Sequence, residues 1–333
     1  MLRIFAGQNG RLKTIPDFDD PEAASALWID LLSASADEVR RLEAHLGIAI
    51  PTRDEMAEIE LSDRLYNEDG AEFMTMTAVT EIESDDPLKA PITFILKGQT
   101  LVTVRHFDSK PFAHYIAKGL RGNAGQCMTG EAVMLGLVEA LIDRVADALE
   151  RIGDEADAIS REVFRNKAKS ATKKTRDLQS LIEQIGRKGD LLTKLRESLI
   201  SMIRLAAYHT AVEINRTAGS SSRKATKDIR ERVKLIQRDA ASLGEHAIFL
   251  SAKINFLLDA TLGLINLEQN QIIKIFSVAA VVFLPPTLVA SIYGMNFDLM
   301  PELKWTLGYP WALGLMVLSA IVPYVYFKRR GWL

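Results

Sequence analysis

Two long apolar segments lie near the end of the sequence, and neither contains a charged residue. The first has nineteen residues, from Ile275 to Tyr293, and the second has twenty-three, from Trp305 to Phe327. An α-helix rises about 1.5 Å per residue and the hydrocarbon core of a bilayer is about 30 Å thick, so each segment is long enough to cross a membrane once. The alternative is a pair of buried helices in a soluble domain, which two adjacent runs of this length disfavour.

Basic residues flank the two segments on one side. Lys274 precedes the first, and three basic residues follow the second: Lys328, Arg329 and Arg330. The connecting residues, 294–304, hold Asp298, Glu302 and a single lysine. Because positive charge gathers on the cytoplasmic side of membrane proteins, we expect both chain termini in the cytoplasm and the short loop outside.

Residues 1–128 carry a mixed pattern that predicts a cytoplasmic α/β domain. The apolar run 28–32 is typical of a buried strand. Residues 36–46 have apolar positions at helical spacing, and we expect Ser35 to cap that helix. A further helix is expected over 51–65, with a proline near its start.

Two later segments of the same domain are rich in Thr, Val, Ile and Phe, as strands are. They cover 72–82 and 91–105, and the sequence Lys97-Gly98-Gln99 predicts a hairpin turn within the second. The domain is therefore expected to be a small sheet flanked by helices.

From residue 129 onward the pattern is helical. Three long amphipathic stretches, 131–164, 174–209 and 226–276, lack proline, and Gly219-Ser220-Ser221-Ser222 separates the last two. If 226–293 is one helix, its 68 residues extend about 100 Å. Such a length predicts a coiled-coil-like stalk that continues into the membrane.

The expected architecture is an α+β membrane protein built from consecutive parts. They are the α/β domain 1–128, the long-helix stalk or funnel 129–273, a first transmembrane helix 274–293, an outer loop 294–304, a second transmembrane helix 305–327 and a basic cytoplasmic tail 328–333.

Composition excludes several classes of protein. Lys and Arg total 41 and Asp and Glu total 43, for a net charge of −2, whereas nucleic-acid-binding proteins have a strong basic excess. The single cysteine, Cys127, excludes an internal disulfide and suits a chain that faces the cytosol. No nucleic-acid partner is therefore expected.

Signatures of enzymes are absent from the sequence: it has no GxxxxGK[ST], GxSxG, HExxH or CxxC. We therefore expect neither an enzyme nor a nucleotide partner, and no catalytic residues. Five histidines are scattered and are interpreted as surface or packed residues. Loop-like acid clusters, such as Glu81/Glu83/Asp85/Asp86, are either solvated or regulatory cation sites.

A stripe of mostly small or polar residues follows the first apolar segment at alternating steps of four and three. This 3.5-residue period is typical of a helix that faces partners in a supercoiled bundle. Small residues allow close helix packing, and polar ones can line a wetted pore; the stripe alone leaves both open. A pore would need several chains around an axis. The stripe comprises Asp259, Gly263, Asn266, Asn270, Ile273, Ser277, Ala280, Leu284, Thr287, Ser291 and Gly294.

The first span ends in YGMNF at 293–297, and MPEL follows at 300–303. These motifs, with NLEQNQIIKIFSVAAVVFLPPTLVAS before them, two terminal spans and a basic tail, resemble the CorA family of magnesium and cobalt transporters. The resemblance is dense over 257–333, and before that it concerns architecture alone. It implies a homopentameric channel in the bacterial inner membrane, whose first spans line the pore.

The resemblance also implies roles for individual residues. Asn296, with Gly294 and Met295, would form the selective outer mouth, and Asp298 and Glu302 would attract cations to it. Lys274 and the C-terminal basic residues would form a basic ring. Along the pore the implied wall runs from Asp259 in the funnel and Asn270 at the cytoplasmic end to Ile273, Ser277, Ala280, Leu284, Thr287 and Ser291. Ser291 stands where many relatives have glycine, and Phe276 replaces an aliphatic residue.

The chemistry of Mg²⁺ agrees with these roles. This ion keeps an octahedral water shell and loses it reluctantly, so neutral oxygens that contact its waters suit it, whereas carboxylates in the span would hold it too tightly. Mg²⁺ is expected as the transported and the regulatory ion, with no cofactor. Co²⁺ and Ni²⁺ are expected to pass if the ion stays hydrated.

Closure is expected at Leu284 or Ile273 by dewetting, under control of intracellular Mg²⁺. Asp239 and Glu245 are guesses at regulatory ligands.

Two alternatives remain. One is a zinc transporter of the same superfamily, which MPEL and the lack of Cys and His in the stripe disfavour. The other is a non-conducting, membrane-anchored helical scaffold.

Overall fold

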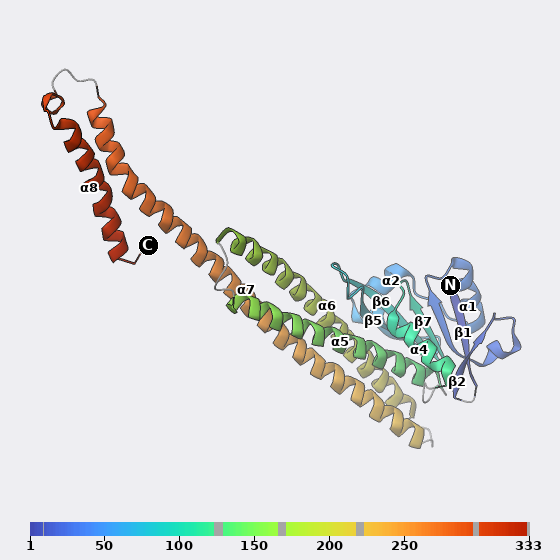
Figure 1. The fold of residues 1–333 in the computed structure, drawn as a ribbon. Helices are drawn as coiled ribbons and strands as arrows, with labels where there is room; N and C mark the ends of the chain where they lie inside the picture. Colours follow the sequence, from blue (N-terminus) through green and yellow to red (C-terminus); the bar gives the residue numbers. More distant parts are fainter. Residues whose placement is uncertain (9, 123–128, 166–170, 218–222, 296–299, 332–333) are drawn as a thin grey trace. The chain divides into compact units, whose positions relative to one another are not determined.

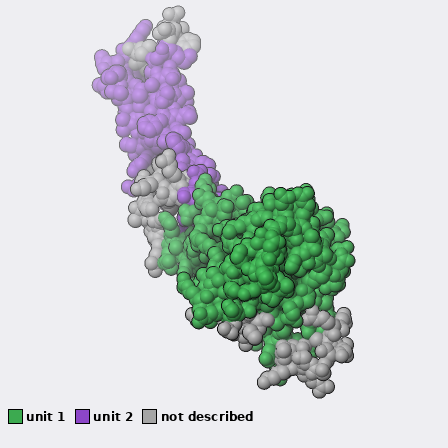
Figure 2. Space-filling model, turned by 90° about the vertical axis from the view of Figure 1, so that its right-hand side faces the viewer, with its two compact units in different colours: residues 1–162, 183–257 green, residues 163–182, 258–333 purple. Residues whose placement is uncertain are grey.

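The computed structural model of the chain describes residues 1–333 apart from 9, 123–128, 166–170, 218–222, 296–299 and 332–333. The described residues form two compact units. The first comprises Met1–Glu162 and Glu183–Leu257, and the second comprises Val163–Ile182 and Leu258–Leu333 (Figure 2).

A seven-stranded sheet is the centre of the N-terminal part of the first unit (Figure 1). Its strand order is β2-β1-β3-β7-β6-β5-β4, and only β3 and β7 pair in parallel among these strands. The strands are β1 (Leu2–Gln8), β2 (Arg11–Ile15), β3 (Ala26–Leu32), β4 (Leu65–Glu68), β5 (Ala71–Thr80), β6 (Leu88–Lys97) and β7 (Thr100–Arg105).

The predicted strand over 28–32 is confirmed within β3, and the predicted hairpin is confirmed between β6 and β7. Lys97 pairs with Thr100 across the turn. Gly98 has φ +61°, a left-handed conformation that costs glycine little, because it has no Cβ.

Helix α1 (Ala36–Leu46) begins at the predicted cap. The Ser35 hydroxyl accepts from the Glu38 amide, and the Glu38 carboxylate accepts from the Ser35 amide, which satisfies both groups at the helix start. Gly47 ends the helix in the left-handed conformation, with φ 62°. The predicted helix 36–46 is therefore confirmed.

The single helix expected over 51–65 is wrong. Two short helices, α2 (Arg53–Ala57) and α3 (Leu61–Arg64), lie there, and β4 begins at Leu65. The chain is extended at Glu58, where ψ is 149°, and again at Glu60, where ψ is 135°. Acidic side chains crowd this break: Asp63, Glu55 and Glu60 raise the pKa of the Glu58 carboxyl. Like charges within one or two turns disfavour a continuous helix.

The two faces of the sheet bury different groups. Ile29 and Leu31 belong to an apolar cluster with Leu42 of α1 and Met56 of α2. On the other face Trp28 contacts Phe112 of α4 (Lys110–Arg121), with ring centroids 6.2 Å apart. Helices thus cover both faces, as expected for an α/β domain.

A buried ion pair joins the two parallel strands. Arg105 Nη2 lies 2.7 Å from Asp30 Oδ2 and Arg105 Nε lies 3.0 Å from Asp30 Oδ1, and both side chains are almost fully buried. Thr103 donates a further hydrogen bond to Asp30, and the Arg105 guanidinium lies over the Phe112 ring. The charges are therefore compensated inside the domain.

Three long helices follow: α5 (Gly130–Arg165), α6 (Ala171–Thr217) and α7 (Arg223–Tyr293). The three helices predicted from residue 131 onward are confirmed, including the continuation of the last one to residue 293. Arg232 of α7 forms two hydrogen bonds to Glu139 of α5, at 2.6 and 2.7 Å. The buried face of α7 in the first unit repeats at steps of three, four and seven: Val233, Ile236, Ala240, Ala247, Leu250, Ile254 and Leu257.

The second unit contains the apolar end of α7, a short 3₁₀ turn η2 (Pro301–Lys304) and α8 (Gly308–Arg329). α8 runs back antiparallel to the end of α7 (Figure 1). Both helices are long and apolar enough to cross a membrane, and most of their apolar side chains are exposed in the single chain.

Candidate functional site

The predicted stripe lies along α7, and all eleven of its positions are exposed in the single chain. Its two largest apolar members, Ile273 and Leu284, are 60% and 64% exposed. By contrast, Val278 on the same helix is buried. The stripe is therefore a continuous surface that neighbours in an assembly can cover or that water can reach.

Two hydroxyl groups in this stripe are oriented by the helix backbone. Ser277 Oγ donates to the Ile273 carbonyl at 2.8 Å, and Thr287 Oγ1 donates to the Phe283 carbonyl at 2.8 Å. Because each hydroxyl proton is used within the helix, the oxygen lone pairs remain to accept hydrogen bonds from outside. Waters around a cation direct their hydrogens outward, so such oxygens suit a hydrated cation.

A shallow groove of about 430 Å³ also lies on the stripe. It begins near Ala280 and reaches Ser291, with Leu284 and Thr287 between them. Pro285 and Pro286 lie inside the helix at this level, and neither has an amide proton to give to the preceding turn. The carbonyls freed there add acceptors to this part of the helix.

α7 ends at Tyr293, the first residue of the YGMNF motif. Gly294 donates to the Ala290 carbonyl at 2.9 Å, and Met295 donates to the Ile292 carbonyl at 3.2 Å. Asn296 and Asp298 lie outside the described residues. For Glu302 the structure describes the backbone, which belongs to η2.

The predicted basic residues lie at one end of the two apolar helices. Lys274 is exposed on α7, and Lys328 and Arg329 lie in the last turn of α8. Arg330 caps α8, and its guanidinium lies 5.5 Å from the centre of the Tyr326 ring. Since α8 runs antiparallel to α7, the basic residues of both helices lie at the same end of the apolar pair.

Acids on α7 before its apolar end face outward. Asp239, Glu245 and Asp259 are all exposed. Burial, with the nearby charges of Asp147, Glu139 and Asp239, raises the pKa of Asp143 on α5. Within the described residues no three His, Cys, Asp or Glu side chains form a ready metal site. The described acids of one chain therefore repel one another here.

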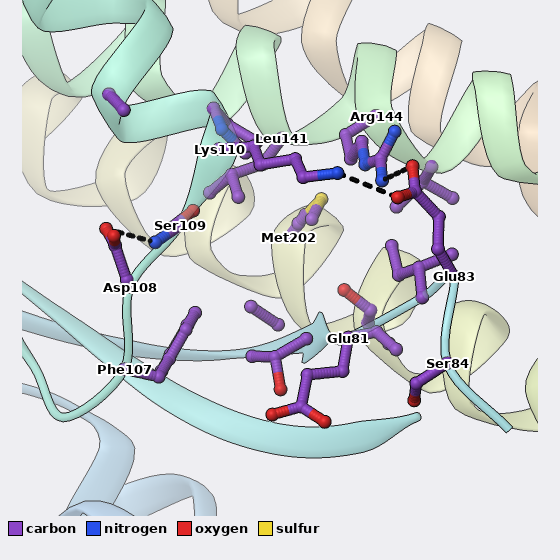
Figure 3. Close-up of a pocket in the computed structure, with 18 residues that line it drawn as sticks. Glu81, Glu83, Ser84, Phe107, Asp108, Ser109, Lys110, Leu141, Arg144 and Met202 are labelled. Carbon is purple, nitrogen blue, oxygen red and sulfur yellow. Dashed lines mark hydrogen bonds and ion pairs between the residues drawn. The ribbon is translucent and has the colours of Figure 1, made fainter. Parts of the chain in front are cut away.

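The acidic loop 81–86 is largely neutralised within the chain. The Glu83 carboxylate accepts from Lys110 and Arg144, each at 2.7 Å, and these contacts hold its pKa near 2 (Figure 3). Asp85 pairs with Arg187. Glu83 and Asp85 therefore act as clips between this loop and the helices, and a cavity of about 450 Å³ lies behind the loop.

One part of the surface was missed by the sequence analysis. The period of the stripe, extended toward the start of α7, falls on Phe256, Phe249 and Leu235, which are 60%, 61% and 57% exposed. Exposed aromatic residues at the period of a coiled-coil face indicate a contact with other chains. Continuing the steps of four and three beyond Asp259 would have found them.

Comparison with known proteins decides the family. A family model described as "CorA-like Mg2+ transporter protein" matches residues 23–329. The magnesium transport protein CorA of Escherichia coli strain K12 is 35% identical over 335 residues, which covers all of both chains. This chain belongs to the CorA family.

Solved structures of a CorA protein and of a ZntB domain have a similar fold. The complete CorA magnesium transporter from Methanocaldococcus jannaschii has a TM-score of 0.70 at 17% identity and covers 100% of this chain and 99% of its own. The cytoplasmic domain of ZntB from Vibrio parahaemolyticus has a TM-score of 0.55 at 9% identity and covers 78% of this chain and 96% of its own. The predicted fold class, an α/β domain, a long helix and two terminal apolar helices, is confirmed as that of CorA, and the two candidate spans place this CorA chain among membrane proteins.

Proposed function

We propose that five copies of this chain assemble around an axis and that their α7 helices line a channel for Mg²⁺. The observation that carries the proposal is the stripe of α7, exposed at every position in a chain of a magnesium-transporter family. Five copies of the face that bears Phe249 and Phe256 would bury those rings against neighbours. The protein is then a transporter, with no resident cofactor and no nucleotide.

The membrane arrangement follows from the charges beside the spans. Lys274 and the basic end of α8 lie on the cytoplasmic side in this proposal, together with both termini, and residues 294–304 lie outside. In a bacterial cell the protein sits in the inner membrane, crossing it twice. The inside-negative potential then drives a divalent cation inward by about 4.6 kcal/mol at 100 mV.

Ion selection belongs to the outer mouth in this proposal. A ring of Asn296 side-chain amides, supported by Gly294 and Met295, contacts the waters of hydrated Mg²⁺, and Asp298 and Glu302 raise the local cation concentration. The outward lone pairs of Ser277 and Thr287 support the passage of an ion that keeps its shell. Since Co²⁺ and Ni²⁺ have the same charge and similar hydrated size, they share the path.

The pore wall combines acceptors with apolar constrictions. Asp259 and Asn270 would lie at the cytoplasmic entrance, Ser277, Ala280, Thr287 and Ser291 along the wall, and rings of Ile273 and Leu284 would close the path by dewetting. Both constriction side chains are exposed on α7 and are free to meet across an axis.

Gating in this proposal depends on intracellular Mg²⁺. A cation bound between neighbouring chains holds the stalks symmetric and the constrictions closed, and its loss lets them separate. Asp239 and Glu245 are the proposed ligands from α7. Burial, with smaller contributions from Asp147, Glu139 and Asp239, raises the pKa of Asp143, and a divalent cation would relieve the repulsion among these acids.

Two other functions compete with this proposal. A zinc transporter of the same superfamily is one alternative, but 35% identity to a magnesium transport protein favours magnesium. A non-conducting scaffold would use the small residues of the stripe for helix packing, but it would not need its exposed Asn, Ser and Thr side chains.

Flux into proteoliposomes tests the proposal. Wild-type protein should carry Mg²⁺ inward, and Asn296→Ala should abolish uptake. Asn255→Ala is the matched control, because Asn255 is exposed on α7 and lies off the stripe. Zinc uptake without magnesium uptake would identify the zinc transporter, and no flux of either ion would support the scaffold. A monomer in lipid would disprove the channel.

A further inference from the structure

A second cavity, of about 540 Å³, lies in the first unit. It is bounded by α3, by β5 and β6, and by α6. Its polar lining residues are Glu58, Arg64, Thr77, Lys89, Glu197, Ser201 and Arg204. Its volume falls in the range of sites that hold small molecules.

The charges in this cavity are only partly compensated. Lys89 pairs with Glu197 at 2.7 Å. For the guanidinium groups of Arg64 and Arg204, by contrast, the described part of the chain offers no carboxylate within 4.0 Å. Glu58 is an exposed carboxylate of the lining, and the neighbouring Asp63 raises its pKa.

Arg64 is held in this position although it is poorly satisfied. It is half-buried, its Nη2 donates to Thr77 Oγ1 at 3.1 Å, and its Nε is buried without a hydrogen-bond partner. Burial and the charge of Arg204 lower the pKa of Arg64. Two guanidinium groups placed close together, with an unused donor between apolar walls, cost free energy unless an anion neutralises them.

The geometry points to a binding site for a small phosphate ester or a similar oxyanion. Arg64 and Arg204 would hold the oxyanion by charge-assisted hydrogen bonds, for which planar guanidinium groups are well suited. Ile59, 91% exposed at the rim, and Ile200 would contact the apolar part of the ester. This site is separate from the α7 stripe, so it does not depend on the proposed transport function.

Titration calorimetry on the full-length protein in detergent, without Mg²⁺, tests the site. The probes are inorganic phosphate and phenyl phosphate, with sodium chloride at equal ionic strength as the reference. Both phosphates should bind, and phenyl phosphate should bind more tightly because its ring can contact Ile59 and Ile200. Arg204→Gln, at an exposed position, should weaken binding about tenfold or more.

Arg40→Gln is the control, since Arg40 is an exposed arginine of α1 whose loss removes the same charge elsewhere. It should leave the affinity unchanged. Arg64→Gln should weaken binding as Arg204→Gln does, and circular dichroism reports whether that variant folds. Binding that is equal in wild type and Arg204→Gln, or heat no larger than that of chloride, would overturn the site. Heat no larger than that of chloride would also be seen if a carboxylate of a neighbouring chain occupied the cavity, and the cavity would then not be a phosphate site.

Discussion

His209 Nδ1 lies 3.0 Å from Glu72 Oε2, a contact that joins α6 to β5 across 137 positions of the sequence. The other ring nitrogen lies 2.7 Å from Glu131 Oε1 of α5. The imidazole is 1% exposed. Burial lowers its pKa, but the two carboxylates outweigh that effect and raise the pKa to about 9. The charged ring therefore links the sheet to two long helices at neutral pH.

Stability should depend on pH through this group. The pKa of His209 is raised from 6.5 to about 9 on folding, so its contribution is fully present below pH 6.5 and is lost as pH rises through 9. The melting temperature should fall between pH 7 and pH 10. His209→Gln should lower it at neutral pH and flatten the dependence, whereas His45→Gln, at an exposed position, should keep the wild-type profile. An unchanged slope in His209→Gln would contradict this account.

The buried pair Asp30–Arg105 should be far more costly to break than an exposed one. Asp30→Asn removes the buried carboxylate partner of Arg105, whose other carboxylate contact is the exposed Asp108 at 3.7 Å, and should lower the free energy of unfolding by about 3–5 kcal/mol. Asp37→Asn removes an exposed partner of Arg40 and should cost less than about 1 kcal/mol. Urea denaturation measures both variants, and a similar small loss in each would show that the buried charge is not paired as described.

Loop 81–86 should become more mobile when its clip is removed. Glu83→Gln weakens the contacts with Lys110 and Arg144, so amide hydrogen exchange in the loop should speed up at pH 7. Because the pKa of Glu83 falls from 4.5 to about 2 on folding, the wild-type loop should show the same loosening as pH drops from 4.5 toward 2. Glu81→Gln is the control: its carboxylate points away from those cations (Figure 3), and equal exchange in both variants would argue against the clip.

Leu284 should act as a closing residue in the proposed channel. Leu284→Ser makes the constriction wettable, so Mg²⁺ influx at high internal Mg²⁺ should rise severalfold. Leu288→Ser is matched in chemistry and lines the same groove but lies off the stripe, so it should keep the closed level. Flux assays with loaded proteoliposomes compare the two, and equal leaks would place the closure elsewhere.

Much of the helical architecture could be predicted because its signals are local. Ser35 and Glu38 form a capping box that is visible in the sequence. The helical spacing of apolar residues in α5, α6 and α7 can likewise be read without knowing any distant contact. The break at Glu58–Glu60 was missed because apolar spacing continues through it, and only the crowding of acids opposes the helix. The β1–β2 hairpin and α4 were also missed, since both are held by the sheet that they complete.

The candidate site divides in the same way. The stripe on α7 follows from spacing alone, and the structure exposes every member of it. The link between Glu72, Glu131 and His209 could not be predicted, because it joins residues that lie far apart in the chain. In the sequence His209 was one of five scattered histidines, interpreted as surface or packed, and it proves to be packed.

The hydroxyls of Ser277 and Thr287 donate their protons to carbonyls of their own helix, and this has a consequence for the passage of anions. Water molecules around chloride direct their hydrogens toward the ion, so their lone pairs face outward. Such a hydration shell needs hydrogen-bond donors around it, and these two side chains do not offer any. A lumen built from them would discriminate by the sign of the permeant ion without any fixed charge. Such discrimination would persist at high ionic strength, where the attraction of a carboxylate ring is screened.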